Sequence, residues 1–170
     1  PAFVAYMVAG DPDYETSLEV AKAIIDGGAN VLELGFPFTD PVADGPVIQK
    51  ADVRALSAGM APWEFFRLAA EIRRYSEIPM VAFTYANPVF RMGLERFYEC
   101  AREAGMDAVL IVDMPLEEAQ EALSAAKKND LHQIFLISQT TSQERLVHIA
   151  EHGSGFLYLV SALGITGRSE

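Results

Sequence analysis

The sequence predicts an α/β fold built on a parallel β-sheet, because short apolar segments alternate with longer amphipathic segments along the chain. Six apolar segments are expected to form strands: residues 3–9, 30–35, 80–84, 108–112, 134–137 and 156–160. Five segments with helical spacing of apolar residues lie between them: about 14–26, 62–74, 94–104, 115–128 and 143–151. Strands joined through helices make right-handed crossovers, so neighbouring strands should be parallel.

Local signals mark the ends of the expected helices. The first helix stops at Gly27, and the second starts at Pro62, since proline is favoured in the first helical position. Gly105 ends the third helix, and Pro115 opens the fourth. Ser142 is the expected N-cap of the last helix, because its hydroxyl can accept from a free backbone N–H.

Residues 36–59 are expected to be a long connecting segment with several prolines and two Asp-containing turns. No repeat or linker divides the chain, so residues 1–170 are expected to form one domain. Residues 10–13, the first turn, lack the Gly-x-Gly-x-x-Gly spacing of a dinucleotide site, which argues against a Rossmann fold. Periodicity leaves open whether the sheet is open and doubly wound or belongs to a (β/α)₈ barrel.

Composition excludes several classes of function. The chain has 170 residues, 51% of them hydrophobic, with 13 Lys+Arg against 24 Asp+Glu and a net charge of −11. This charge disfavours binding to nucleic acid or to anionic membranes. A single cysteine, Cys100, cannot form an internal disulfide, and no apolar run reaches the ~18 residues of a membrane helix. The N-terminus lacks the features of a signal peptide, so we expect a soluble cytoplasmic protein.

Two carboxylates stand out as candidates for chemistry. Glu33 lies near the end of an expected buried strand, where a carboxylate is costly unless it is satisfied or used. Asp44 lies in a loop stiffened by Pro41 and Pro46, which would present it rigidly. The alternatives for Glu33 are a solvated strand end or a structural ion pair, and the alternative for Asp44 is an ordinary turn role. Together they would supply one acid/base group and one fixed hydrogen-bond acceptor.

Other polar and aromatic residues have less specific placements. Asp113 follows an expected strand and is equally well placed as a helix N-cap. Four aromatic residues lie in or just after expected strands, where they suit either a core or a flat aromatic ligand: Tyr6, Phe83, Tyr85 and Tyr158. His148 and His152 could ligate a metal at their i,i+4 spacing, but without a zincin motif a solvated helix end is favoured. No metal site is therefore expected.

Residues 32–49, Leu-Glu-Leu-Gly-Phe-Pro-Phe-Thr-Asp-Pro-Val-Ala-Asp-Gly-Pro-Val-Ile-Gln, strongly resemble the tryptophan synthase α subunit family. Three further motifs fall in the matching order: Gly10-Asp11-Pro12, Tyr85-Ala86-Asn87-Pro88 and Gly164-Ile165-Thr166-Gly167. The resemblance covers essentially the whole chain. It implies a (β/α)₈ TIM barrel and a carbon–carbon lyase of tryptophan biosynthesis. Such a lyase cleaves indole-3-glycerol phosphate to indole and glyceraldehyde 3-phosphate, in a retro-aldol reaction without a cofactor.

The resemblance also implies roles for individual residues. Glu33 matches the general acid/base, and Asp44 matches the carboxylate that accepts a hydrogen bond from the indole N–H. Positions matching the family's substrate-binding site are Tyr6, Phe83, Tyr85, Leu136, Tyr158 and Thr166. Asp40 and Pro41 match the interface with the β subunit, which uses pyridoxal phosphate and receives the indole within an α2β2 complex.

A barrel of this type needs roughly 250 residues, so we expect this sequence to represent only part of one. The part expected to be missing carries strands seven and eight, whose loops hold substrate phosphate in such barrels. Two alternatives to the channelling lyase follow from the resemblance. One is a non-catalytic barrel that binds and activates the β subunit, and the other is a stand-alone lyase that releases indole.

Overall fold

The computed structural model describes residues 1–161, and within them a six-stranded parallel sheet forms the centre of the molecule. Its strands, in chain order, are β1 (Val4–Val8), β2 (Val31–Gly35), β3 (Met80–Thr84), β4 (Ala108–Ile111), β5 (His132–Ser138) and β6 (Leu157–Val160). They lie side by side in the same order as in the sequence, and all five pairings are parallel. This order, without a reversal, is that of a (β/α) barrel rather than a doubly wound sheet.

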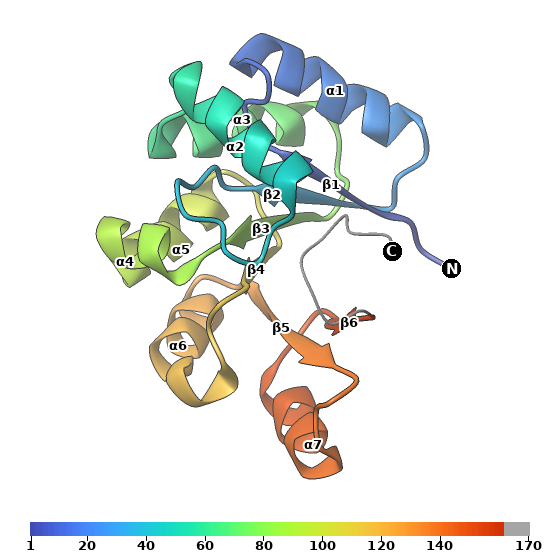
Figure 1. Cartoon of the computed structure of the whole chain (residues 1–170), viewed down its shortest axis with the longest axis vertical. Helices are drawn as coiled ribbons and strands as arrows, with labels where there is room; N and C mark the ends of the chain where they lie inside the picture. Colours follow the sequence, from blue (N-terminus) through green and yellow to red (C-terminus); the bar gives the residue numbers. More distant parts are fainter. Residues whose placement is uncertain (162–170) are drawn as a thin grey trace.

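The helices lie on one side of the curved sheet, as they do on the outside of a barrel (Figure 1). Their bounds are α1 (Tyr14–Asp26), α2 (Pro46–Ser57), α3 (Pro62–Tyr75), α4 (Ala86–Met92), α5 (Leu94–Glu103), α6 (Gln120–Lys128) and α7 (Gln143–His152). The structure confirms the N-cap expected at Ser142, whose hydroxyl accepts from the backbone N–H of Arg145. The first helix also has a capping side chain, because Asp13 accepts from the Thr16 N–H at 2.8 Å.

Two helices lie where no helix is predicted from the sequence. Helix α2 occupies much of the 36–59 segment, and it begins at Pro46 because proline suits the first helical turn. Helix α4 contains Pro88 in its first turn, where the missing N–H costs no intrahelical bond. The reverse error occurs after Pro115, whose extended backbone is followed by a short 3₁₀ turn, η1 (Leu116–Glu118). The regular helix α6 therefore starts five residues later than predicted.

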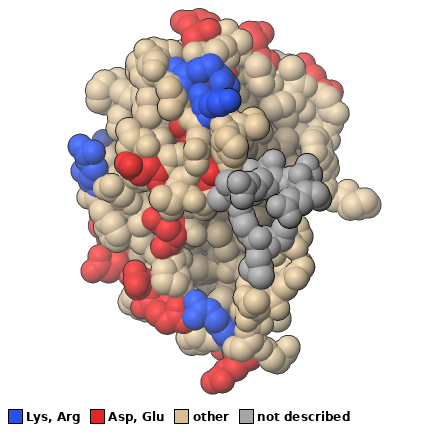
Figure 2. All heavy atoms as spheres, in the orientation of Figure 1, with Lys and Arg blue, Asp and Glu red and all other residues tan. Residues whose placement is uncertain are grey.

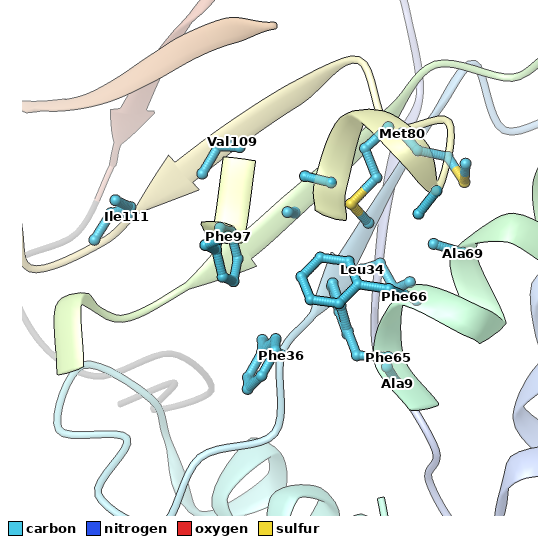
Figure 3. Close-up of a cluster of buried hydrophobic side chains, with 14 of the residues drawn as sticks. Ala9, Leu34, Phe36, Phe65, Phe66, Ala69, Met80, Phe97, Val109 and Ile111 are labelled. Atoms are coloured by element: carbon cyan, nitrogen blue, oxygen red, sulfur yellow. The ribbon is translucent and has the colours of Figure 1, made fainter. Parts of the chain in front are cut away.

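The main hydrophobic core fills the space between the sheet and its helices. Alternate strand residues such as Leu34 and Met80 point into it, and they meet aromatic side chains of α3 and α5 (Figure 3). The rings of Phe36 and Phe65 lie 4.8 Å apart, and those of Phe66 and Phe97 lie 5.4 Å apart. Burying this apolar surface fixes the helices against the sheet.

The opposite, concave face of the sheet carries a second and smaller apolar cluster. Its fully buried members come from the middle strands: Val81, Ala108, Leu110 and Ile134. Phe83, Leu136 and Tyr158 extend this cluster and are only partly buried. Because side chains alternate along a strand, the concave face is filled by the residues that do not enter the main core. This face is where the candidate site lies.

Acidic residues are spread over the surface, and Lys and Arg do not merge into a continuous basic patch on the face drawn in Figure 2. Among residues 1–161, the helices are all too short or too polar to cross a membrane.

Candidate active site

The register of the first three strands places Glu33 on the concave face. Glu33 pairs with Tyr6 on β1 and with Val81 on β3, and Val81 belongs to the concave cluster. Only 2% of the Glu33 surface is exposed. Its Oε1 atom is the one buried side-chain oxygen or nitrogen among the described residues that has no hydrogen-bond partner. The ion pair considered from the sequence is therefore absent, since no described cation contacts this carboxyl.

Burial changes the acid–base properties of Glu33. Loss of hydration disfavours the charged carboxylate and raises the pKa of Glu33 to about 7. A carboxyl with this pKa can both donate and accept a proton near neutral pH. The unpartnered oxygen also means that no protein hydrogen bond must break before it meets a substrate atom.

Asp44 reaches the same face from the loop that follows β2. Within this loop, the Val42 N–H donates to the Asp40 carbonyl and the Asp44 N–H donates to the Pro41 carbonyl, at 2.9 and 3.0 Å. The Gln49 side chain of α2 donates to the Asp44 carbonyl at 2.8 Å, which ties the loop to the helix. These bonds give the loop a defined course and leave the Asp44 side chain buried.

Tyr85, immediately after β3, fixes the Asp44 carboxylate. Its hydroxyl donates to Asp44 Oδ2 at 2.7 Å and accepts from the Ala43 N–H at 3.1 Å. Burial raises the pKa of Asp44, while the hydrogen bond from Tyr85 acts in the opposite direction. Asp44 Oδ2 is thus held in place by protein, as a fixed acceptor requires.

Aromatic side chains surround the two carboxyls. The rings of Tyr6 and Phe83 meet edge to face at 5.0 Å. Tyr6 lies over Gly35, where a Cβ atom would come within 3 Å of the Tyr6 hydroxyl and ring, so only glycine leaves room for the ring. On β6, Tyr158 packs against the concave cluster, and burial and the charges of Glu33 and Asp44 raise the pKa of its hydroxyl.

Most of the residues expected at the site are therefore together. Tyr6, Phe83 and Tyr158 lie with Glu33 and Asp44, and Leu136 joins them on the concave face through its pairing with Tyr158. Asp40 and Pro41 lie apart, at the outer part of the loop, where Asp40 is exposed and accepts from the Thr39 hydroxyl. Thr166 and the motif 164–167 fall outside the described residues.

Asp113 has a structural partner that the sequence did not indicate. It does not cap the helical segment that follows it. Instead its Oδ1 accepts from the Ala86 N–H at 2.7 Å, at the start of α4. The carboxylate thus satisfies a free N–H of a helix that precedes it by 27 residues.

Asp52 is a buried carboxyl near the site that sequence reasoning missed. It lies on α2 between the buried Ala51 and Ala55, and only 4% of its surface is exposed. Burial and the charge of Asp44 raise the pKa of Asp52 to about 7. A hydrogen bond from the Phe38 backbone N–H lowers this pKa, but by less. An aspartate on the apolar face of a helix is the signal that could have identified it, once residues 46–57 were read as helical.

Comparison with known families agrees with this geometry. The model of the family described as "Tryptophan synthase alpha chain" matches residues 1–170. A tryptophan synthase alpha chain of Methanoregula boonei is 54% identical over 166 residues, which cover 98% of this chain and 63% of that protein. One from Methanothermobacter thermautotrophicus is 51% identical over 166 residues, covering 98% and 62%. The chain thus spans less than two thirds of the length of these relatives.

Solved structures with a similar fold come from the same family. A chain of Mycobacterium tuberculosis tryptophan synthase superposes with a TM-score of 0.93 at 33% identity, covering 99% of this chain and 65% of the other. A chain from the tryptophan synthase α2β2 complex of Pyrococcus furiosus gives a TM-score of 0.90 at 40% identity, covering 95% and 68%. With the parallel strand order and the outer layer of helices, these matches identify the fold as part of a (β/α)₈ barrel. The chain belongs to the tryptophan synthase alpha chain family.

Proposed function

We propose that this chain carries the acid–base centre of a carbon–carbon lyase that cleaves indole-3-glycerol phosphate to indole and glyceraldehyde 3-phosphate. The observation that carries the proposal is the buried Glu33 carboxyl, which has an unpartnered oxygen and faces the same space as the fixed carboxylate of Asp44. A structural role would not require one buried carboxyl oxygen to be left without a partner.

Glu33 would act as both acid and base. In its protonated form it donates its proton to C3 of the indole ring, which places positive charge on the ring nitrogen. As the bond from C3 to the glycerol carbon breaks, the electron pair returns to the ring. The carboxylate of Glu33 takes the proton of the adjacent glycerol hydroxyl, which becomes the aldehyde. Glu33 is then protonated again, and acid–base catalysis of this kind contributes about 10²–10⁴-fold.

Asp44 would stabilise the intermediate by accepting a hydrogen bond from the ring N–H. Its negative charge is close to the nitrogen on which positive charge develops, and this arrangement favours the protonated ring over the ground state. Tyr85 supports this role, because its hydrogen bond orients the Asp44 carboxylate before substrate binds.

The aromatic and aliphatic side chains of the concave face would hold the indole ring. We assign this role to Tyr6, Phe83, Tyr85, Leu136 and Tyr158, with Thr166 as the sixth substrate-binding residue. Apolar walls suit a flat aromatic ligand and exclude water from the two carboxyls. Proton transfer by Glu33 accounts for the chemistry without a metal or an organic cofactor.

The loop that carries Asp44 would also contact a β subunit in an α2β2 complex, through Asp40 and Pro41. The neighbouring Val42 supports this assignment, because 75% of its surface is exposed. Val47, on the first turn of α2, is 69% exposed. Exposed apolar side chains on a rigid loop are typical of a protein interface. Pyridoxal phosphate would be held by the β subunit alone, and the complex would work in the cytoplasm.

The decisive measurement is indole release from indole-3-glycerol phosphate by the 170-residue chain, with and without β subunit. Release by this chain would show that strands seven and eight, whose loops hold phosphate in such barrels, are dispensable. In a barrel that includes these two strands, Glu33→Gln should lower turnover by at least ~10²-fold, because only proton transfer is removed. Asp44→Asn should also lower turnover, since it removes the negative charge beside the ring nitrogen. Glu77→Gln is the matched control, because the Glu77 side chain is 97% exposed and precedes β3, whereas the proposed site includes Tyr85 at the other end of that strand.

The outcomes separate the candidate functions. Release that disappears in Glu33→Gln but not in Glu77→Gln supports the lyase, and dependence on β subunit supports a channelling complex over a stand-alone enzyme. Activation of β-subunit serine chemistry without cleavage selects the non-catalytic binding role. Near-normal turnover in Glu33→Gln would contradict the mechanism.

A further inference from the structure

The C-terminal half of helix α7 gathers three potential metal ligands on one exposed face. His148, Glu151 and His152 each offer a ligand atom, and these atoms all lie within 4.8 Å of one another. We propose that these three side chains form a surface site for a divalent transition-metal ion of the Zn²⁺ or Cu²⁺ class. This site is separate from the proposed active site and does not depend on the lyase reaction.

Helical geometry brings the three side chains together. Residues three and four positions apart lie on one face of an α-helix, so His148 is a neighbour of both Glu151 and His152. The two imidazole rings confirm this, with centroids 4.5 Å apart. The sequence alone favours a solvated helix end for the two histidines. The structure adds the carboxylate of Glu151 as a third donor.

The hydrogen bonding of His152 prepares it as a ligand. Its Nδ1 lies 2.9 Å from the backbone carbonyl oxygen of His148. A carbonyl oxygen can only accept, so Nδ1 carries the hydrogen of the neutral ring and the free electron pair lies on Nε2. Metal-binding histidines are usually held in this way, with the other ring nitrogen donating to a carbonyl or a carboxylate.

The donor set selects the kind of ion. Two imidazoles and one carboxylate suit Zn²⁺ and Cu²⁺, whereas Mg²⁺ and Ca²⁺ prefer sites made of oxygen atoms alone. Ligand atoms around a tetrahedral Zn²⁺ are about 3.4 Å apart, given bonds of about 2.1 Å. The exposed side chains can close from 4.8 Å to this spacing by small rotations. Water would occupy the fourth position.

The surrounding charges favour a cation. Arg145 lines the same surface depression as His148 and Glu151, but its guanidinium is paired with Glu117, with Nη2 2.9 Å from Oε2. This pairing reduces its repulsion of a bound ion. The depression is also lined by Glu144, and the chain as a whole has a net charge of −11.

A bound ion would stabilise α7 in its helical form. Ile149 is the only buried residue of this helix, so few contacts hold it against the sheet. Ligands separated by one turn meet only when that turn is helical. Binding therefore adds stability to the folded state in proportion to the logarithm of metal concentration above the dissociation constant.

Calorimetric titration of the 170-residue chain with Zn²⁺ alone tests the proposal. We expect one ion per chain, and a decrease in affinity of at least about tenfold in His148→Gln and in His152→Gln, because each removes a ligand. Glu151→Gln should have a smaller effect. His132→Gln is the matched control, because His132 is the third histidine of the chain and lies outside the cluster.

A second measurement locates the ion. Paramagnetic Cu²⁺ should broaden the amide resonances of residues 145–153 before those of the rest of the chain. The proposal is overturned if Zn²⁺ does not bind, if His148→Gln and His152→Gln bind as the wild type does, or if broadening starts elsewhere, for example around Cys100. These variants are exposed and leave Glu33 and Asp44 intact, so cleavage activity has no bearing on the outcome.

Discussion

The Tyr85 hydroxyl donates a hydrogen bond of 2.7 Å to Oδ2 of Asp44, although the two residues lie 41 positions apart in the chain. The bond joins the end of β3 to the loop after β2. The same hydroxyl accepts from the Ala43 N–H, so it holds the backbone of the loop as well as its carboxylate. The orientation of the proposed ring-binding carboxylate is therefore set by the neighbouring strand.

Tyr85→Phe should destabilise the protein by about 1.5–3 kcal/mol, because it removes a buried hydrogen bond to a carboxylate and leaves the Ala43 N–H without its acceptor. It should also raise the pKa of Asp44 further, since the Tyr85 bond lowers that pKa. Urea unfolding and carboxyl NMR titration would measure these two effects.

Tyr75→Phe is the matched control for this substitution. Tyr75 also donates to a carboxylate, that of Asp26, but both groups are exposed. Its loss should change the free energy of unfolding by about 0.5 kcal/mol or less. Equal effects of the two substitutions would show that the Tyr85–Asp44 bond is no stronger than a surface contact.

Glu33 should make the protein less stable as the pH rises through the neutral range. Its carboxyl ionises near 4.5 when unfolded and near 7 when folded. Between these values the folded state binds more protons, so the free energy of unfolding falls with pH and levels off above both. Glu33→Gln cannot ionise, so its stability relative to wild type should rise by on the order of 2 kcal/mol between pH 5.5 and 8.5.

Urea unfolding at the two pH values measures this difference, with Glu77→Gln as the exposed control. The contrary result is that Glu33→Gln and wild type differ in stability by the same amount at both pH values. This result would mean that the pKa of Glu33 is not raised in the folded protein. In that case its role as a neutral-pH acid would lose its support.

Asp52→Asn should also stabilise the protein at alkaline pH. The pKa of Asp52 is raised to about 7 by burial and by Asp44, and ionisation above that pH places two carboxylates close together. Asparagine keeps an oxygen for the Phe38 N–H but cannot ionise. The stability of Asp52→Asn relative to wild type should rise by on the order of 2 kcal/mol between pH 5.5 and pH 8.5, measured by denaturant unfolding.

Asp52→Ala separates charge from hydrogen bonding in this experiment. It also removes the carboxylate, but it leaves the Phe38 N–H without its acceptor. We expect it to be less stable than Asp52→Asn at both pH values. Equal stability of the two variants would assign the whole effect to charge.

Gly35→Ala should displace Tyr6, because the new Cβ atom would overlap the Tyr6 hydroxyl and ring. We expect a loss of about 1–3 kcal/mol, as for other overpacked sites. Tyr6→Leu removes the ring and should partly relieve this strain. In a double-mutant cycle the two changes should therefore be non-additive by about 0.5–3 kcal/mol, and additive values would refute the contact.

Sequence reasoning recovered the elements whose signals are local. The apolar segment 80–84 is β3 (Met80–Thr84), and the segment 14–26 is α1 (Tyr14–Asp26). Both have clear periodicity, and α1 has a capping aspartate and a terminal glycine. The prediction failed in the proline-rich segment 36–59, which is expected to be a connection although Pro46 lies in the first turn of α2. It also assigned no helix to residues 86–92, which form α4.

The sequence by itself determined the alternation of strands and helices, the family, and the two carboxylates on which the proposed chemistry rests. Tertiary structure alone decided that Glu33 lacks a partner, that Tyr85 holds Asp44, and that Asp52 lies beside them. Tertiary structure likewise decided that Asp113 accepts a hydrogen bond from the Ala86 N–H, 27 residues earlier in the chain. The physical reason is that strand periodicity and capping depend on residues a few positions apart. Burial and hydrogen bonding at the site instead depend on which strands become neighbours in the sheet.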